Sequence, residues 1–206
     1  DIVLGPDHIA RLPELIEAKR RTVAVNFEDI SDYQFPSPVR LPDEGPSGRE
    51  RDLSPIQASV GLGPRERKAY VTIMKGCDNT CSFCIVPMTR GPEASRPADE
   101  IVAEIQRLSA AGVREVMLLG QNVNAWRGTV EGAIADFAEL LYFANEIEGI
   151  KRIRYTTSHP REFTQRLIDA HAELPALAPH VHLPVQSGSD RVLAAMKRGY
   201  TSLEYR

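Results

Sequence analysis

The stretch PADEIVAEIQRLSAAGVREVMLL (residues 97–119) decides the fold, because it joins a helical pattern to a strand pattern. Ile101, Ile105 and Leu108 recur at the spacing of one helix face, after a proline where a first helical position is expected. Gly112 then marks the end of this helix. The apolar residues within 113–119 predict a short buried strand. The stretch therefore predicts one helix followed by one strand, the building unit of an α/β fold.

The same alternation extends outward over residues 69–206. Strands of 4–8 residues that alternate with helices of 10–15 residues are typical of parallel sheets. Four consecutive βα units therefore predict a parallel sheet, as a βα barrel or an open doubly wound sheet. The expected strands cover 69–74, 113–119, 151–157 and 181–185, and the later helices lie near 137–147, 162–172 and 189–198.

The chain before residue 69 has a different character. Residues 1–34 begin with a strand, helix and strand pattern, which is typical of the last part of a truncated amino-terminal α/β domain. Residues 35–68 are expected to form a linker, because the interval 35–64 holds six prolines and four glycines. Since the sequence begins without an initiator methionine and stops after the fourth βα unit, we expect an internal fragment of a longer protein.

Composition excludes some classes of protein. Hydrophobic residues make up 42% and charged residues 26%, an ordinary globular profile. No apolar run approaches the roughly 18–20 residues of a membrane-spanning helix, so we expect no membrane span. The net charge of −3 provides no global electrostatic argument for nucleic-acid binding.

All three cysteines of the chain fall within eight residues, as Cys77, Cys81 and Cys84 in the pattern C-x3-C-x2-C. An odd, clustered set is a poor disulfide framework and indicates a metal site. Three thiolates on one loop can ligate three irons of a cubane cluster and leave the fourth iron open. Two other interpretations stay open: a zinc site completed by His159 or His182, and three unligated core cysteines.

The carboxyl ends of the four expected strands carry small and polar residues. In parallel βα folds the ligand site forms at these ends. The end segments are residues 75–84, 120–124, 158–160 and 186–189. The sequence therefore predicts an active site where these segments meet.

The cysteine loop and its flanks resemble a known family. C-x3-C-x2-C with Phe83 just before the last cysteine resembles the signature of radical S-adenosylmethionine (SAM) enzymes. Residues 76–97 are similar to the methylthiotransferase family. The strings LLGQNVNAW (118–126) and HLPVQSGSD (182–190) resemble its branch that acts on tRNA. The resemblance is strong over 69–206 and implies an α/β fold: a partial radical SAM (βα) barrel preceded by the remnant of an α/β domain.

The resemblance implies a reaction and its cofactors. It implies that Cys77, Cys81 and Cys84 ligate a [4Fe–4S] cluster whose open iron binds SAM. An electron from the cluster would cleave SAM to a 5′-deoxyadenosyl radical, and a methylthio group would replace hydrogen at C2 of N6-isopentenyladenosine near the tRNA anticodon. Two alternatives remain: the related enzyme that modifies an aspartate of a ribosomal protein, and a non-catalytic iron–sulfur binding module.

The resemblance also implies roles for residues beside the cysteines. The residues implied to contact SAM are Phe83 at the adenine, Gly120, Gln121 and Asn122 at the methionine amine, and Ser158 and Gln186 at the ribose or carboxylate. Candidates for contacts with substrate or phosphate are Arg90, Glu93, Arg96 and Asn124. The competing interpretations are an ordinary turn at 120–122 and a surface salt-bridge pair for the two arginines.

The implied partners are tRNA and a reducing protein such as flavodoxin or ferredoxin, in a cytoplasmic monomer. The full-length protein would hold a second [4Fe–4S] cluster on three further cysteines. This chain has no cysteines left for that second cluster, because all three are already assigned.

Overall fold

The computed structural model describes residues 2–4, 12–17, 22–24, 67–130 and 132–206. In the first part, β1 (Ile2–Leu4) pairs in parallel with β2 (Thr22–Ala24), and α1 (Leu12–Glu17) lies between them in sequence. This agrees with the expected strand, helix and strand. The predicted linker 35–68 falls almost entirely outside the described residues, so the predicted domain boundaries stay predictions.

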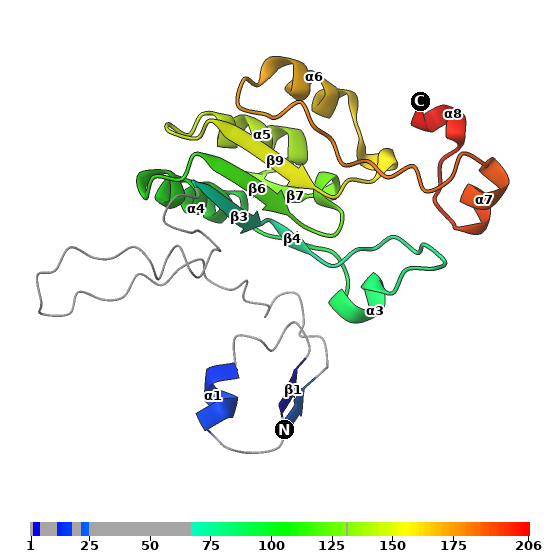
Figure 1. The fold of residues 1–206 in the computed structure, drawn as a ribbon, viewed down its shortest axis with the longest axis horizontal. Helices are drawn as coiled ribbons and strands as arrows, with labels where there is room; N and C mark the ends of the chain where they lie inside the picture. The colour runs from blue at the N-terminus through cyan, green and yellow to red at the C-terminus, as the bar shows by residue number, and fades with distance from the viewer. Residues whose placement is uncertain (1, 5–11, 18–21, 25–66, 131) are drawn as a thin grey trace, which may run out of the picture.

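A parallel three-stranded sheet forms the centre of the second part (Figure 1). Its strands lie in the order β3 (Lys68–Thr72), β6 (Glu115–Leu119) and β9 (Arg152–Thr156). Lys68 pairs with Glu115, which pairs with Arg152, so the three strands start level with one another. The parallel sheet predicted from the alternation is therefore confirmed.

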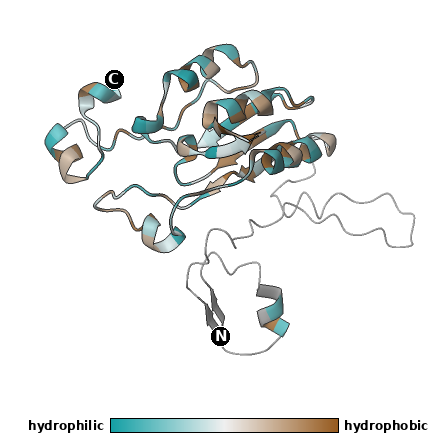
Figure 2. Cartoon of the chain, turned by 180° about the vertical axis from the view of Figure 1, so that it is seen from behind, coloured by the Kyte–Doolittle hydropathy of each residue, from teal (hydrophilic) through white to brown (hydrophobic). Residues whose placement is uncertain are grey.

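Two helices bury their apolar faces against this sheet. In α4 (Ala98–Ala110), Ile101, Ile105 and Leu108 are buried as predicted. The helix begins one residue later than expected, because Pro97 is its N-cap residue. In α5 (Phe137–Asn145), Leu140 and Leu141 are fully buried. Figure 2 shows both hydrophilic and hydrophobic residues along the helices, as is expected of helices with one buried side.

The predicted fourth strand at 181–185 is wrong: no residue of this range is in a strand. The chain instead touches β9 earlier, through an isolated parallel bridge between Ile153 and Leu177. Pro175 and Pro179 flank this bridge, and proline has no N–H to donate to a ladder. The pairing therefore stops at a single bridge, and the described fold has three βα strands in its sheet instead of four.

The cysteine loop is closed at its base by a small antiparallel pair. β4 (Met74–Lys75) pairs with β5 (Ala94–Ser95), so the expected strand at 69–74 is in fact divided between two sheets. Gly76 follows with φ +71°, and a Cβ there would lie 1.9 Å from the Pro92 carbonyl oxygen. Only glycine fits at this position, because any side chain would clash with the Pro92 backbone. The two ends of the loop can therefore lie close together. The loop also contains the short helix α3 (Val86–Arg90).

The hairpin β7 (Arg127–Val130) and β8 (Ala133–Asp136) was not predicted from the sequence. It follows the short 3₁₀ turn η2 (Val123–Ala125) and leads into α5. Half of its strand residues are exposed and they lack a regular apolar alternation, so the usual strand signal is absent.

The remaining helices are shorter than expected. The helix expected at 162–172 is η3 (Pro160–Glu162) followed by α6 (Gln165–Glu173), and the helix expected at 189–198 is α7 (Asp190–Ala195). A last short helix, α8 (Ser202–Tyr205), follows. Among the described residues, no helix has both the length and the apolar character that crossing a membrane requires.

Candidate functional site

The three predicted cluster ligands lie on the loop between β4 and β5. Cys77, Cys81 and Cys84 are partly exposed free thiols. Each sulfur accepts one N–H hydrogen bond: Cys77 from Asn79 Nδ2 at 3.3 Å, Cys84 from Val86 N at 3.4 Å, and Cys81 from Arg198 Nη1 at 3.0 Å. N–H donors to the ligand sulfurs are one of the features by which proteins adjust iron–sulfur clusters. The chemistry of this donor set therefore fits such a group.

The structure does not bring the three sulfurs together into a formed metal site. Within the described ranges, no group of three or more histidine, cysteine, aspartate or glutamate side chains could hold a metal ion. This holds equally for the cysteines alone and for the cysteines with His159 or His182. The ligand set therefore remains a prediction.

Polar atoms without partners lie at the carboxyl ends of β6 and β9. Gln121 Oε1, Asn122 Oδ1 and Ser158 Oγ are buried and have no hydrogen-bond partner. Asn122 and Ser158 are themselves only 4% and 5% exposed. A buried polar group without a partner is costly and uncommon, so several of them at one rim indicate room for a polar ligand. These are three of the residues implied to contact SAM.

The other residues implied to contact SAM differ in their surroundings. Phe83 is 59% exposed, so it is not an aromatic residue of the core. Gln186 is exposed and has a left-handed backbone with φ +67°. At Gly120, an added Cβ would lie 2.4 Å from Met74 Cγ. Close packing against Met74 is therefore reason enough for glycine at this position.

Arg96 lies in the interior and not at a surface that could bind phosphate. It is 5% exposed and forms a buried ion pair with Glu104 of α4. It also pairs with Glu100 at 3.3 Å and donates to the Thr72 carbonyl at 3.2 Å. The backbone carbonyl of Arg96 accepts from Trp126 Nε1 at 3.0 Å. These contacts give Arg96 a structural role, as a buried pair and not the surface pair also considered.

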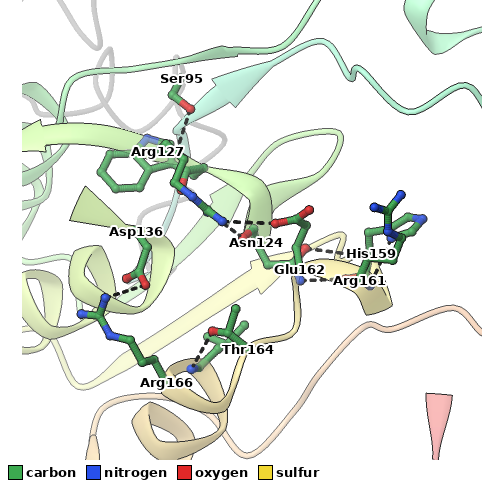
Figure 3. A network of polar contacts seen from close by, with 11 residues as sticks. Ser95, Asn124, Arg127, Asp136, His159, Arg161, Glu162, Thr164 and Arg166 are labelled. Atoms are coloured by element: carbon green, nitrogen blue, oxygen red, sulfur yellow. Dashed lines mark hydrogen bonds and ion pairs between the residues drawn. The ribbon is translucent and has the colours of Figure 1, made fainter. Parts of the chain in front are cut away.

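Asn124 is fully engaged with the backbone of His159 (Figure 3). Its Nδ2 donates to the His159 carbonyl at 2.9 Å, and its Oδ1 accepts from the His159 N–H at 2.8 Å. The pair ties the segment after β6 to the segment after β9. The contacts of Asn124 therefore favour a structural role over a substrate contact. Arg90, by contrast, is exposed in the last turn of α3.

Glu93 connects the cysteine loop with the strand ends. Its backbone N–H donates to Asp78 Oδ1 at 2.9 Å. Burial first, and then the charges of Asp78 and Glu162, raises the pKa of the Glu93 carboxyl to about 7, against the lowering effect of Arg127 and of a hydrogen bond from Asn122. Arg127 in turn forms an ion pair with Glu162 at 3.2 Å (Figure 3). Glu93 can therefore hold or release a proton near neutral pH.

His159 is a neutral buried group beside this rim. Burial first, and then the nearby charges of Arg198 and Arg161, lowers its pKa to about 4. Its Nε2 has no hydrogen-bond partner. Arg198 itself was not among the residues predicted from the sequence, because its position next to Gly199 signals only the end of a helix.

A separate groove of about 1060 Å³ lies between α4, α5 and β7. Its apolar lining includes Val102, Val130, Phe143 and Ile147. None of the predicted site residues lines this groove. The cysteine loop and the groove are thus distinct features of the fold.

The chain belongs to the radical SAM superfamily, whose family model matches residues 71–205. The chain is also similar to curated proteins with a more specific name. It is 52% identical to the tRNA-2-methylthio-N(6)-dimethylallyladenosine synthase of Nitrosomonas europaea and 50% identical to that of Thiobacillus denitrificans. Each match covers 100% of this chain and 42% of the relative, so the chain spans about two fifths of their length. The resemblance to tRNA methylthiotransferases is thereby confirmed.

Solved structures support the fold. The chain matches the radical SAM methyltransferase TsrM from Kitasatospora setae, with tryptophan and a SAM analogue bound, at a TM-score of 0.54 and 16% identity. This match covers 84% of the chain and 30% of TsrM. The cobalamin-dependent SAM radical enzyme OxsB matches at a TM-score of 0.51 and 16% identity, over 66% of the chain and 21% of OxsB. Together with the parallel sheet, these matches confirm a partial radical SAM barrel.

Proposed function

We propose that this chain is the cluster- and SAM-binding part of a tRNA methylthiotransferase. The whole enzyme would place a methylthio group on C2 of N6-isopentenyladenosine in the anticodon region of tRNA. One observation carries the proposal: the unpartnered polar atoms of Gln121, Asn122 and Ser158 lie at the strand ends of a fold whose relatives carry this name. The membership of residues 71–205 in the radical SAM superfamily supports it.

In this proposal Cys77, Cys81 and Cys84 hold the [4Fe–4S] cluster and leave one iron for SAM. A cluster held there would provide one-electron reduction of SAM, with cleavage of a carbon–sulfur bond. The protein supplies position, since a cofactor enzyme contributes mainly binding, orientation and exclusion of water. Phe83, an exposed aromatic residue two positions after Cys81, would pack against the adenine.

The strand ends would orient the rest of SAM. Gln121 and Asn122 offer buried carbonyl oxygens, which are acceptors suited to the methionine amine. The Ser158 hydroxyl can donate to a carboxylate or ribose oxygen, and Gln186 is the second candidate for that contact. Burial gives Glu93 a pKa of about 7, so near neutral pH its carboxyl can keep a proton or accept one from a bound group.

Further parts of the proposal concern the whole protein. Its substrate would be tRNA, with Arg90 as the remaining candidate for a phosphate contact. A flavodoxin or ferredoxin would supply electrons, and the protein would act as a monomer in the cytoplasm. A second [4Fe–4S] cluster would need cysteines beyond the three of this chain.

Anaerobic reconstitution of the chain tests the cluster and SAM cleavage. We expect a brown protein with four irons per chain. After reduction with dithionite, it should convert SAM to 5′-deoxyadenosine, measured by chromatography. A variant with all three cysteines changed to serine is the control and should bind no iron. A colourless protein with stoichiometric zinc, or a brown protein that yields no 5′-deoxyadenosine even at full length, would contradict the proposal.

Deletion of the gene tests the substrate. We expect the methylthio-nucleoside to disappear from hydrolysed tRNA, as measured by mass spectrometry, while the ribosomal-protein aspartate stays unchanged. Loss of the aspartate modification with unchanged tRNA would favour the ribosomal-protein enzyme instead.

A further inference from the structure

Arg198 contacts the middle cysteine from a distant part of the chain. Its Nη1 donates to Cys81 Sγ at 3.0 Å, across 117 positions of sequence. Arg198 is only 8% exposed. Its Nε is buried and has no hydrogen-bond partner. A guanidinium this buried and aimed at a thiol is unusual, because buried charges are normally paired with opposite charges.

The backbone around Arg198 fixes the direction of this side chain. Lys197 and Gly199, on either side, both have left-handed backbones, with φ +55° and φ +70°. The Arg198 N–H donates to the Leu193 carbonyl of α7 at 3.0 Å. The guanidinium lies over the Tyr200 ring, 5.7 Å from its centroid. The side chain is therefore held in place by a sharp turn and a cation–π contact.

Residues just before Arg198 also form hydrogen bonds with the cysteine loop, next to Cys81. Ser82 N donates to the Met196 carbonyl at 3.2 Å, and Ser82 Oγ donates to the Ala195 carbonyl at 3.0 Å. Figure 1 shows α7 lying beside the part of the chain that carries α3. Residues 195–198, here called the α7 clamp, thus make three hydrogen bonds to the centre of the loop.

The donor to Cys81 differs in charge from the other two. The sulfurs of Cys77 and Cys84 accept from neutral groups, the Asn79 amide and the Val86 backbone. The donor to Cys81 is a guanidinium, which stays protonated in proteins. A charged donor gives a stronger hydrogen bond and also places a fixed positive charge beside one corner of any group held by the loop.

We propose that Arg198 is a positioning residue that holds the Cys81 sulfur and raises the reduction potential of the cluster. The inference rests on the proposed function, in which the cluster takes up one electron. Reduction adds a negative charge, so a nearby cation stabilises the reduced form more than the oxidised form. Hydrogen bonds to ligand sulfurs act in the same direction. The α7 clamp thus couples the carboxyl-terminal part of the chain to the ease of electron uptake.

The test compares reconstituted variants of the full 206-residue chain, whose three cysteines can hold only one cluster of this type. Arg198→Met removes the charge and the donor, and Arg198→Lys keeps the charge without the planar fork. Arg191→Gln is the control, because it removes a positive charge from an exposed position of α7, the helix that precedes Arg198. The readouts are the midpoint potential from a dye-mediated titration followed by electron paramagnetic resonance, and the rate of bleaching by a chelator.

Arg198→Met should lower the midpoint potential and lose its cluster about tenfold faster than the unchanged chain. Arg198→Lys should have a midpoint potential and a bleaching rate between those of Arg198→Met and the unchanged chain. Arg191→Gln should match the unchanged chain in both measurements. An unaltered potential and bleaching rate in Arg198→Met would overturn the inference. If Arg198→Met takes up no cluster, the same two measurements on Arg198→Lys test the inference, and values equal to those of the unchanged chain would overturn it. An unchanged chain that binds no cluster would instead overturn the proposed function.

Discussion

Two regions of the molecule handle buried polar groups in opposite ways. Where α4 covers the sheet, Arg96 and Glu104 are buried and paired with each other. At the carboxyl ends of β6 and β9, Asn122 and Ser158 are equally buried but keep atoms without partners. The first arrangement serves stability, since each buried charge is satisfied. The second is costly for stability and is expected where a ligand completes the hydrogen bonds.

The largest effect should come from breaking the interior pair. Arg96→Ala leaves the Glu104 carboxylate buried without its partner, which costs about 3–5 kcal/mol of the free energy of unfolding. Urea unfolding followed by circular dichroism measures this change. Arg90→Ala, at an exposed arginine, should change stability by less than about 0.5 kcal/mol. Equal effects in the two variants would contradict the structural role assigned to Arg96.

A smaller loss of stability is expected for a substitution at Gly120, which lies between the two regions. Gly120→Ala forces a Cβ to within 2.4 Å of Met74 Cγ, so overpacking should cost about 1–3 kcal/mol. Gly188→Ala is the matched control, because no atom lies within 4 Å of its added Cβ. Thermal unfolding compares the two variants. A stable Gly120→Ala variant that fails to bind SAM would instead show that the glycine serves the cofactor.

Substitutions of two nearby asparagines should affect different properties, one the stability of the chain and the other its binding of SAM. Asn124→Ala removes the acceptor of the His159 N–H and one of the two donors to its carbonyl, which also accepts from Glu162 N, and should cost about 1–3 kcal/mol of stability. Asn122→Ala removes an unpartnered oxygen and one side-chain hydrogen bond to Glu93, so it should change stability by about 1 kcal/mol or less and weaken SAM binding. Chemical unfolding and calorimetric titration with SAM check the pair. The comparison fails if Asn122→Ala unfolds as easily as Asn124→Ala.

The smallest effect concerns the pH dependence of stability. Burial first, then Asp78 and Glu162, raises the pKa of Glu93 from 4.5 to about 7. Between these values the folded chain keeps a proton that the unfolded chain releases, so stability falls as pH rises through this window. Partial exposure screens the effect to about 1 kcal/mol. Glu93→Gln should flatten this part of the curve in unfolding experiments, and an unchanged slope would contradict the shift.

The sequence correctly predicted those elements that depend mainly on residues close together in the chain. The spacing of Ile101, Ile105 and Leu108 predicted the buried face of α4, because one helix face is a property of adjacent turns. The apolar run at 181–185 wrongly predicted a fourth strand. The chain instead forms an isolated bridge to β9 at Leu177, between two prolines. The sequence also predicted polar residues at the strand ends, since a parallel sheet gathers those ends; their contact with SAM stays a prediction.

The sequence by itself determined that three thiols lie within eight residues, that helices and strands alternate, and that the family is the radical SAM superfamily. Only the tertiary structure decided which polar groups are satisfied. It paired Arg96 with Glu104, tied Asn124 to His159, and brought Arg198 to Cys81. The physical reason is that a side chain's type and spacing fix what it can bond, whereas its partners depend on which distant segments the fold brings within about 3 Å.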